Sequence, residues 1–234
     1  MNDSIAIIPL SRLMIIFIPT SLVIIILYSN SLEWRNSIYA IARMLIQLMI
    51  VGYFLSYIFL SNNYLFIILI LILMICIASW IALGTVFEQR KKLLISAFIS
   101  ILVGGTIPLF LVSYFVLQLD PWYMPRYIIP LAGMIFASSM NSISLAAERL
   151  RAELRKNISY DNAKSIALKT ALIPITNSLF AVGLVSIPGM MTGQILSGIS
   201  PLVAIRYQIM VMCMIFSAVG ISTYFFLIMN KSKK

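Results

Sequence analysis

The 234-residue sequence has no histidine, only seven acidic residues and two cysteines. No acidic residue lies inside a long apolar run, so the usual membrane proton relay, which uses Asp, Glu or His, cannot be assigned. The G-x-x-x-x-G-K-[ST] motif is also absent, and no pair of nucleophile and base can be assembled. We therefore expect no catalytic residue, no resident cofactor and no enzyme activity in this chain. The sequence leaves metal binding undetermined.

What the sequence has in abundance is apolar side chains, which make up 62% of the residues against 10% charged ones. Such a composition indicates an integral membrane protein, and a helix needs about 20 mostly apolar residues to cross a bilayer. We predict an all-α, multi-pass protein of the cell's inner or cytoplasmic membrane, with residues 1–234 forming a single transmembrane domain. About seven spans are expected, at residues 13–28, 38–60, 64–86, 93–117, 127–147, 172–187 and 205–229.

Lysine and arginine indicate the orientation of these spans, because cytoplasmic loops carry an excess of both. With the N-terminus outside and the C-terminus in the cytoplasm, all basic residues but four fall on the inner side. The four exceptions are Arg12, Arg43, Arg126 and Arg206. The net charge of +10 is thus explained by membrane anchoring, and we expect no binding to nucleic acid.

One long charged segment, residues 148–170, separates the fifth and sixth predicted spans. Its apolar residues recur every four positions, at Leu150, Leu154 and Ile158, so they share one helix face and the charges occupy the rest. Residues 148–157 are predicted to continue the fifth helix. A second helix is predicted to begin after Ser159, which could cap it, with Asp161 in its first turn. Such a surface segment contacts either another protein or anionic lipid.

Polar side chains inside the spans are candidates for a solute pathway. Arg43 and Gln47 are four residues apart and share a helix face, although Arg43 could also snorkel to the cytoplasmic surface. Ser138 and Ser142 are better explained by hydrogen bonds between helices. Asn141 is bulkier and costlier to leave unpaired, so it is the better pathway candidate.

Residues 188–201 are rich in Pro and Gly but contain no charge, unlike an ordinary exposed loop. Two alternatives stay open: a discontinuous helix beside the solute pathway, or a plain outer loop. This stretch also contains Met190 and Met191, which with Met140 offer soft thioether sulfurs. Methionine is equally common as a filler of gaps between helices.

Several stretches carry a family resemblance: residues 43–48, 129–134, 139–141, 183–195 (GLVSIPGMMTGQI), 200–201 and 206–208. In them the chain resembles the FetB/YbbM family of ATP-binding-cassette (ABC) permeases, which is linked to iron export and has plant relatives linked to aluminium tolerance. The chain departs from the family's pattern at two places. These are Ala137-Ser138 in the fifth span and Asp161-Asn162-Ala163 at the start of the second polar helix.

The resemblance implies a permease that forms a homodimer in membrane lipid and binds two copies of a separate ABC ATPase subunit, which binds the ATP. It makes residues 159–169 a coupling helix. The residues expected to couple to the ATPase are Ser159, Asp161, Ala163, Lys164, Ile166, Ala167 and Lys169. The residues expected in the substrate pathway are Arg43, Gln47, Met140, Asn141, Met190, Met191, Thr192 and Gln194.

The leading hypothesis for function is thus a permease subunit that moves a small solute, with iron export implied by the resemblance alone. Without His or carboxylates in the spans, a chelated metal or a small organic solute is an alternative substrate. A second class is a membrane scaffold or accessory subunit that recruits a soluble partner through the charged segment. A third is a passive channel.

Overall fold

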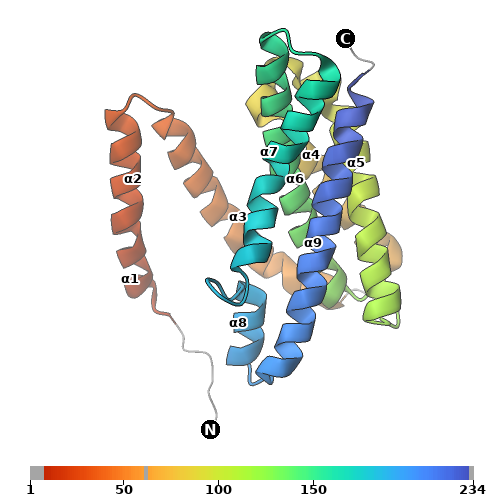
Figure 1. The fold of residues 1–234 in the computed structure, drawn as a ribbon. Helices are drawn as coiled ribbons and strands as arrows, with labels where there is room; N and C mark the ends of the chain where they lie inside the picture. Colours follow the sequence, from red (N-terminus) through yellow and green to blue (C-terminus); the bar gives the residue numbers. More distant parts are fainter. Residues whose placement is uncertain (1–7, 61–62, 232–234) are drawn as a thin grey trace. The chain divides into compact units, whose positions relative to one another are not determined.

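The computed structural model describes residues 8–60 and 63–231, which are divided between two compact units, residues 1–61 and 62–234 (Figure 1). In the first unit, α1 (Leu10–Leu13), η1 (Met14–Ile16) and α2 (Phe17–Ser29) follow one another and α2 packs on α3 (Trp34–Leu60). Tyr28 and Trp34 meet edge to face at the turn, with ring centroids 5.6 Å apart. No side chain of α2 or α3 is buried, so their apolar surfaces are available to lipid or protein.

The second unit contains a bundle of long helices and one short helix. Its elements are α4 (Tyr64–Ala82), η2 (Gly84–Gln89), α5 (Arg90–Phe110), η3 (Leu111–Val116), α6 (Pro125–Arg155), α7 (Tyr160–Ala181), α8 (Gly189–Leu196) and α9 (Pro201–Met229). Prolines stand at the first position of α6 and of α9, where a missing N–H costs nothing. Asn157, with φ of 60°, reverses the chain between α6 and α7.

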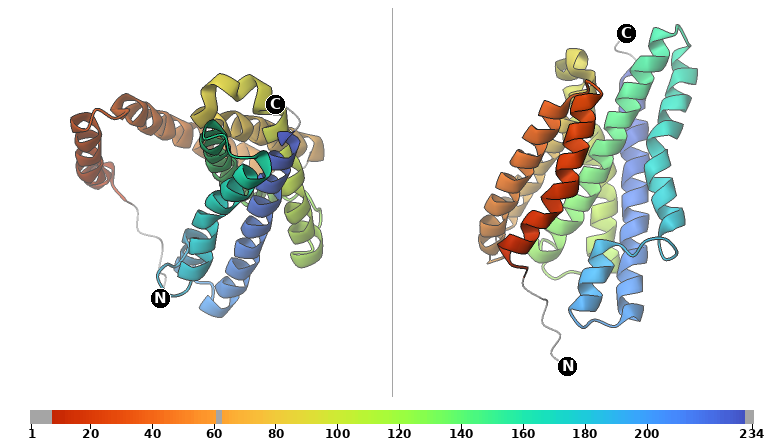
Figure 2. Two further views of the ribbon diagram at one scale, coloured as in Figure 1. Left: turned by 45° about the horizontal axis from the view of Figure 1, so that its top comes forward. Right: turned by 90° about the vertical axis from the view of Figure 1, so that its left-hand side faces the viewer.

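Helices α6 and α9 lie at the centre of this bundle (Figure 2). Helix α6 packs on α4, α5, α7 and α9, and α9 packs on α5, α6, α7 and α8. Fully buried side chains such as Ile101, Ile135 and Phe226 fill the space between them. At Gly104 the backbones of α5 and α9 approach so closely that a Cβ atom would lie 2.5 Å from the Ser222 nitrogen.

Six helices of the described residues are long and apolar enough to cross a membrane: Leu10–Ser29, Trp34–Leu60, Tyr64–Ala82, Gly84–Val116, Pro125–Arg155 and Pro201–Met229. They correspond to six of the seven predicted spans. The sixth predicted span, residues 172–187, is different. Its helix ends at Ala181 and begins far upstream, in the charged segment. The chain is therefore an all-helical multi-pass membrane protein in its described part, while the number of crossings and the orientation of the termini stay predictions.

The boundaries of α7 correct the prediction that a short polar helix after Ser159 is separate from a span at residues 172–187. Helix α7 runs without a break from Tyr160 to Ala181, and Ala163, Ala167 and Ala171 bury one small-residue face of its first half. The predicted second polar helix and the predicted sixth span are thus one element. Beyond it, residues 182–187 form a turn in which the Gly183 N–H donates to the Ser186 carbonyl at 3.0 Å.

Residues 188–201 contain α8 rather than an extended loop. Pro188 precedes the helix, Gly198 follows it with φ of 86°, and α8 packs on α9. The stretch therefore contains a short helix bounded by turns, which is compatible with both alternatives. Whether it lies at membrane depth stays a prediction.

Candidate functional site

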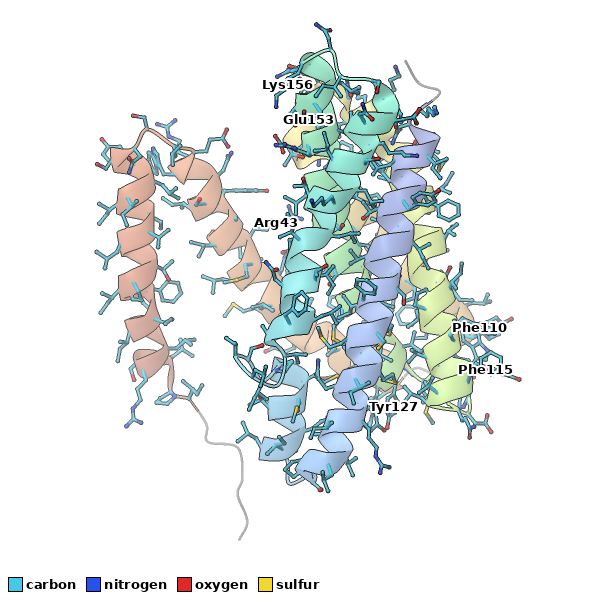
Figure 3. All side chains as sticks on the ribbon, viewed as in Figure 1. Arg43, Phe110, Phe115, Tyr127, Glu153 and Lys156 are labelled. Carbon is cyan, nitrogen blue, oxygen red and sulfur yellow. The ribbon has the colours of Figure 1, made fainter. Side chains whose placement is uncertain are left out.

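The charged end of the bundle is formed by the last turns of α6 and the start of α7. Helix α6 extends to Arg155, so the prediction that the fifth helix continues into the charged segment is confirmed. Glu153 and Lys156 lie beside the turn to α7, and Tyr127 lies near the opposite end of α6 (Figure 3). The structure therefore separates an end rich in charged side chains from an opposite end that has fewer of them, among them Arg126 and Arg206.

Glu153 is the buried carboxylate of this charged end, with 2% of its surface exposed. Arg149 lies 2.7 Å and Lys156 3.3 Å from its Oε1 atom. A buried charge is tolerated only when it is paired, and two cations here share one carboxylate. Glu153 thus fixes the last turn of α6 and the reversal at Asn157.

The start of α7 is attached to the end of α9. The Tyr160 hydroxyl donates a hydrogen bond to the Leu227 carbonyl, and the Lys231 ammonium lies 3.0 Å from Asp161 Oδ1. The hydrogen bond and charge of Lys231 hold the pKa of the Asp161 carboxyl below its usual value. Burial, and then the charge of Asp161, raise the pKa of the Tyr160 phenol.

The expected cap of this helix is wrong in one respect. Ser159 occupies the N-cap position, but its side chain accepts no hydrogen bond from the first turn. The residue is exposed, where water can satisfy the free N–H groups of a helix start. Asp161 supplies the negative charge expected in the first turn.

The residues predicted to couple to an ATPase fall on two faces of α7. Ala163 and Ala167 have no exposed surface and pack inside the bundle. The others are exposed or half-buried: Ser159, Asp161, Lys164, Ile166 and Lys169. In this structure only the outer set is accessible to a partner, and the alanines determine how closely α7 packs.

The residues predicted to line a substrate pathway do not meet in one cavity. Arg43 and Gln47 are exposed on α3 in the first unit. Asn141 lines a small cavity of about 140 Å³ between α6, α7 and α9. Met140, one residue away, is half-buried.

The other predicted pathway residues lie on α8, which separates two larger cavities. Met190 and Gln194 line one of about 450 Å³, and Met191 lines another of about 490 Å³. Thr192 lines neither of them, and its hydroxyl donates a hydrogen bond to the Pro188 carbonyl, 3.1 Å away at the start of the same helix. Around α8, therefore, the predicted residues lie at two neighbouring sites.

Gln208 on α9 was not predicted as a site residue. It lines the cavity of about 490 Å³, is 6% exposed, and its Oε1 atom has no hydrogen-bond partner among the described residues. The sequence could have indicated Gln208, because it is an amide side chain inside an apolar span. The same criterion selected Asn141.

The prediction for Ser142 of α6 is confirmed, because it forms hydrogen bonds to two other helices, whereas Ser138 lines the small cavity beside Asn141. Ser142 Oγ lies 2.7 Å from Thr223 Oγ1 on α9 and donates to the Ala171 carbonyl of α7 at 3.2 Å. Ser222 Oγ donates to Ser139 Oγ at 3.2 Å. Within the described ranges no group of three or more Cys, Asp or Glu side chains could hold a metal ion.

A bundle of long apolar helices with most of its charged side chains at one end defines a multi-pass α-helical membrane protein. The chain belongs to the family described as "Uncharacterised protein family (UPF0014)", whose sequence model matches residues 10–160 and 157–233. No solved structure matches the chain.

Relatives from bacteria and plants cover most of the chain. It is 36% identical over 216 residues to a UPF0014 membrane protein of Synechocystis, covering 82% of each chain. It is 35% identical over 209 residues to the "Probable iron export permease protein FetB" of Escherichia coli, covering 81% of this chain and 77% of that one. It is 33% identical over 218 residues to the Arabidopsis thaliana protein ALUMINUM SENSITIVE 3, covering 86% and 78%.

Proposed function

We propose that this protein is the permease subunit of an ABC transporter that exports a small solute across the inner or cytoplasmic membrane. A separate ATPase subunit binds and hydrolyses the ATP, and two permease chains form a homodimer. Iron is the proposed cargo because the E. coli relative is named "Probable iron export permease protein FetB". The dimer and the ATPase rest on the resemblance described above.

The observation that carries this proposal is the continuity of α7. Its first half carries Asp161 and Lys169, which are exposed, and Lys164, which is half-buried with its ammonium 5.8 Å from the Tyr224 ring centroid of α9. Its last turns line two cavities, through Ser178 beside Asn141 and through Leu179 beside Gln208. A continuous helix that reaches from a contact surface to cavity walls can transmit a displacement at one end to the other, and in α7 this displacement has to pass Pro174.

The buried alanines of α7 support the same mechanism. Ala163, Ala167 and Ala171 place α7 directly against its neighbours, so a push on its exposed face moves the packed helix as a unit. Tyr160 and Asp161 attach the same turn to the end of α9. A partner that displaces the start of α7 therefore also pulls on the C-terminal end of α9. The N-terminal half of α9 lines both cavities around α8.

The test is co-purification of the tagged permease with an ABC ATPase subunit from the same organism. We expect the wild type to retain the ATPase and the Lys164→Glu/Lys169→Glu variant to lose at least tenfold of it. Lys91→Glu is the matched control, because Lys91 is an exposed basic residue of α5 on the same predicted side of the membrane. If the double variant retains as much ATPase as the wild type, the coupling proposal is wrong.

A further inference from the structure

A cavity lined by charged side chains lies at the charged end of the bundle, beside the turn where Figure 3 labels Glu153 and Lys156. Its walls come from the end of η2, the start of α5, the end of α6, Tyr160 of α7 and the end of α9. Its volume is about 370 Å³, within the range of small-molecule sites. The cavity is open to its surroundings, so a ligand can enter it without a change in the fold.

Cations outnumber anions in the walls of this cavity. Lys92 of α5 and Arg151 and Arg155 of α6 line it. The carboxylate of Glu88 is the one negative charge among the described lining residues, so three positive side chains against one leave a net charge of +2. The two arginines are four residues apart and share a face of α6. Each carries a planar fork of N–H donors, which suits the oxygen atoms of a phosphate group.

Arg155 is a cation of this cavity that the fold leaves unmatched. Arg151 already pairs with Glu88, whose side chain is 75% exposed. Arg155 is exposed too, and it has no hydrogen-bond or ion-pair partner in the part of the chain that the structure describes. Its guanidinium can therefore bind an anion without giving up an existing contact.

The start of α5 adds to the positive potential. Arg90, Lys91 and Lys92 form its first turn, which contains no acidic residue, and the N-cap residue Gln89 makes no capping hydrogen bond through its side chain. Positive charges at a helix start oppose the helix dipole, which favours an anion there. Because Gln89 and Lys92 both line the cavity, an anion held in it lies next to this helix start.

The inner wall of the cavity is apolar. Ala147, Leu150 and Phe226 are buried there, which keeps water from one side of a bound anion and strengthens its attraction to the cations. An excess of basic residues is expected at the cytoplasmic end of a membrane protein. That rule explains how many cations lie at this end, but not why three of them surround one cavity while the neighbouring Lys91 does not line it.

We propose that this cavity is a binding site for a phosphate group, which Lys92, Arg151 and Arg155 hold through charge-assisted hydrogen bonds. The group belongs to a soluble phosphate compound or to the headgroup of an anionic phospholipid, since both present the same oxygen atoms. The bound group lies beside Tyr160, whose hydroxyl attaches the first turn of α7 to α9. This inference goes beyond the proposed function and does not depend on it.

The test uses the full-length protein in nanodiscs, with empty nanodiscs as blank, and its two arms distinguish the two sources. In phosphatidylcholine nanodiscs, binding of inorganic phosphate is measured by equilibrium dialysis. In nanodiscs that also contain a minor share of phosphatidylglycerol, native mass spectrometry counts the phosphatidylglycerol molecules that stay bound. We expect saturable binding in at least one arm. Phosphate binding in the first arm assigns a soluble ligand, and retention of phosphatidylglycerol alone assigns the lipid.

Removal of a lining cation should weaken this binding. We expect Arg155→Gln to lower the affinity about tenfold, the effect of one charge-assisted hydrogen bond. Lys91→Gln is the matched control, because it removes the same charge from an exposed residue that does not line the cavity. Its effect should be small, since salt screens a charge outside the site. Equal melting temperatures of the variants and the wild type show that the fold is retained.

Glu88→Gln tests the site in the opposite direction. It removes the carboxylate that lines the cavity and releases Arg151, so the phosphate group should bind more tightly. Glu148→Gln is the control, because Glu148 is an exposed carboxylate of α6 that does not line the cavity. A general effect of surface charge would change the affinity equally in both variants.

Three results would overturn the inference. The first is the absence of saturable binding of either probe to the wild type. The second is an equal loss in Arg155→Gln and Lys91→Gln, or an equal gain in Glu88→Gln and Glu148→Gln. The third is that neither probe binds while Arg155→Gln loses the ATPase in co-purification, which would make the cavity part of a protein contact. The binding assays contain no ATPase and no ATP, so their outcome is independent of the proposed function.

Discussion

Lys231 lies 3.0 Å from Asp161 Oδ1 and 3.2 Å from Asp161 Oδ2, joining the segment that follows α9 to the first turn of α7. Both side chains are more than half exposed, so the pair adds little to global stability. Its effect is local. It holds the start of α7, where we propose that the ATPase binds, against the end of the last helix.

We predict that Asp161→Asn increases hydrogen exchange in residues 160–169 without a measurable change in the melting temperature. Lys231 holds the folded-state pKa of Asp161 below its unfolded value, so this stabilisation is full above the unfolded pKa and is lost as pH falls through the folded pKa. At acidic pH, the hydrogen-exchange rate of these residues in the wild type should approach the rate in Asp161→Asn. Both rates are first corrected for the intrinsic pH dependence of exchange. Equal exchange in both proteins at neutral pH would contradict this role for the pair.

The close approach of α5 and α9 at Gly104 predicts a stability effect. A Cβ at Gly104 would lie 2.2 Å from Ser222 Oγ and 2.5 Å from the Ser222 nitrogen, so the helices must separate. We expect Gly104→Ala to cost about 1–3 kcal/mol, seen as a lower melting temperature in detergent. Gly220→Ala on α9 is the control, because a Cβ added there would meet no atom of a neighbouring helix within 4 Å. Similar melting temperatures for the two variants would contradict the packing described.

The buried hydroxyl pair of α6 and α9 gives a smaller prediction. Ser142 and Thr223 are 2.7 Å apart and both buried. Hydrogen bonds between membrane helices average about 0.6 kcal/mol in double-mutant cycles. We expect a coupling of this order between Ser142→Ala and Thr223→Val, from unfolding in mixed micelles. Strictly additive effects would mean that the two hydroxyls are not energetically coupled.

For the pathway residues, we predict that Asn141→Ala and Gln194→Ala each reduce transport and leave the complex with the ATPase assembled. Because the two side chains line separate cavities, their effects on the transport rate should be additive as free energies. ATP-dependent uptake and co-purification are measured on the same preparations. Loss of assembly in either variant would assign that residue a packing role instead.

Hydropathy predicted most of the helices because each span is bounded by charge or by turn residues, as at Asn63 and Pro125. It misplaced α7 because this helix is polar where it begins and contains Lys169 in its middle, so charge suggested a boundary that the backbone does not have. The continuous face of Ala163, Ala167 and Ala171 was the signal that could have joined the two halves.

The candidate site could be predicted only in part. An amide in an apolar span was enough to select Asn141, and the same criterion applies to Gln208. Which amides share a cavity depends on helix packing, however, and a single sequence does not contain that information. The turn at residues 182–187, which carries the chain from the end of α7 to α8, brings Met191 and Gln208 to one cavity and leaves Gln194 in the next.

The central claim is that this permease moves its solute only when a partner hydrolyses ATP. The most direct measurement is iron uptake into inside-out vesicles that contain the permease and its ATPase subunit, with and without ATP. We predict uptake that requires ATP and both subunits, and that falls at least tenfold in the Lys164→Glu/Lys169→Glu variant. Equal iron flux without ATP, or with the permease alone, would contradict the account.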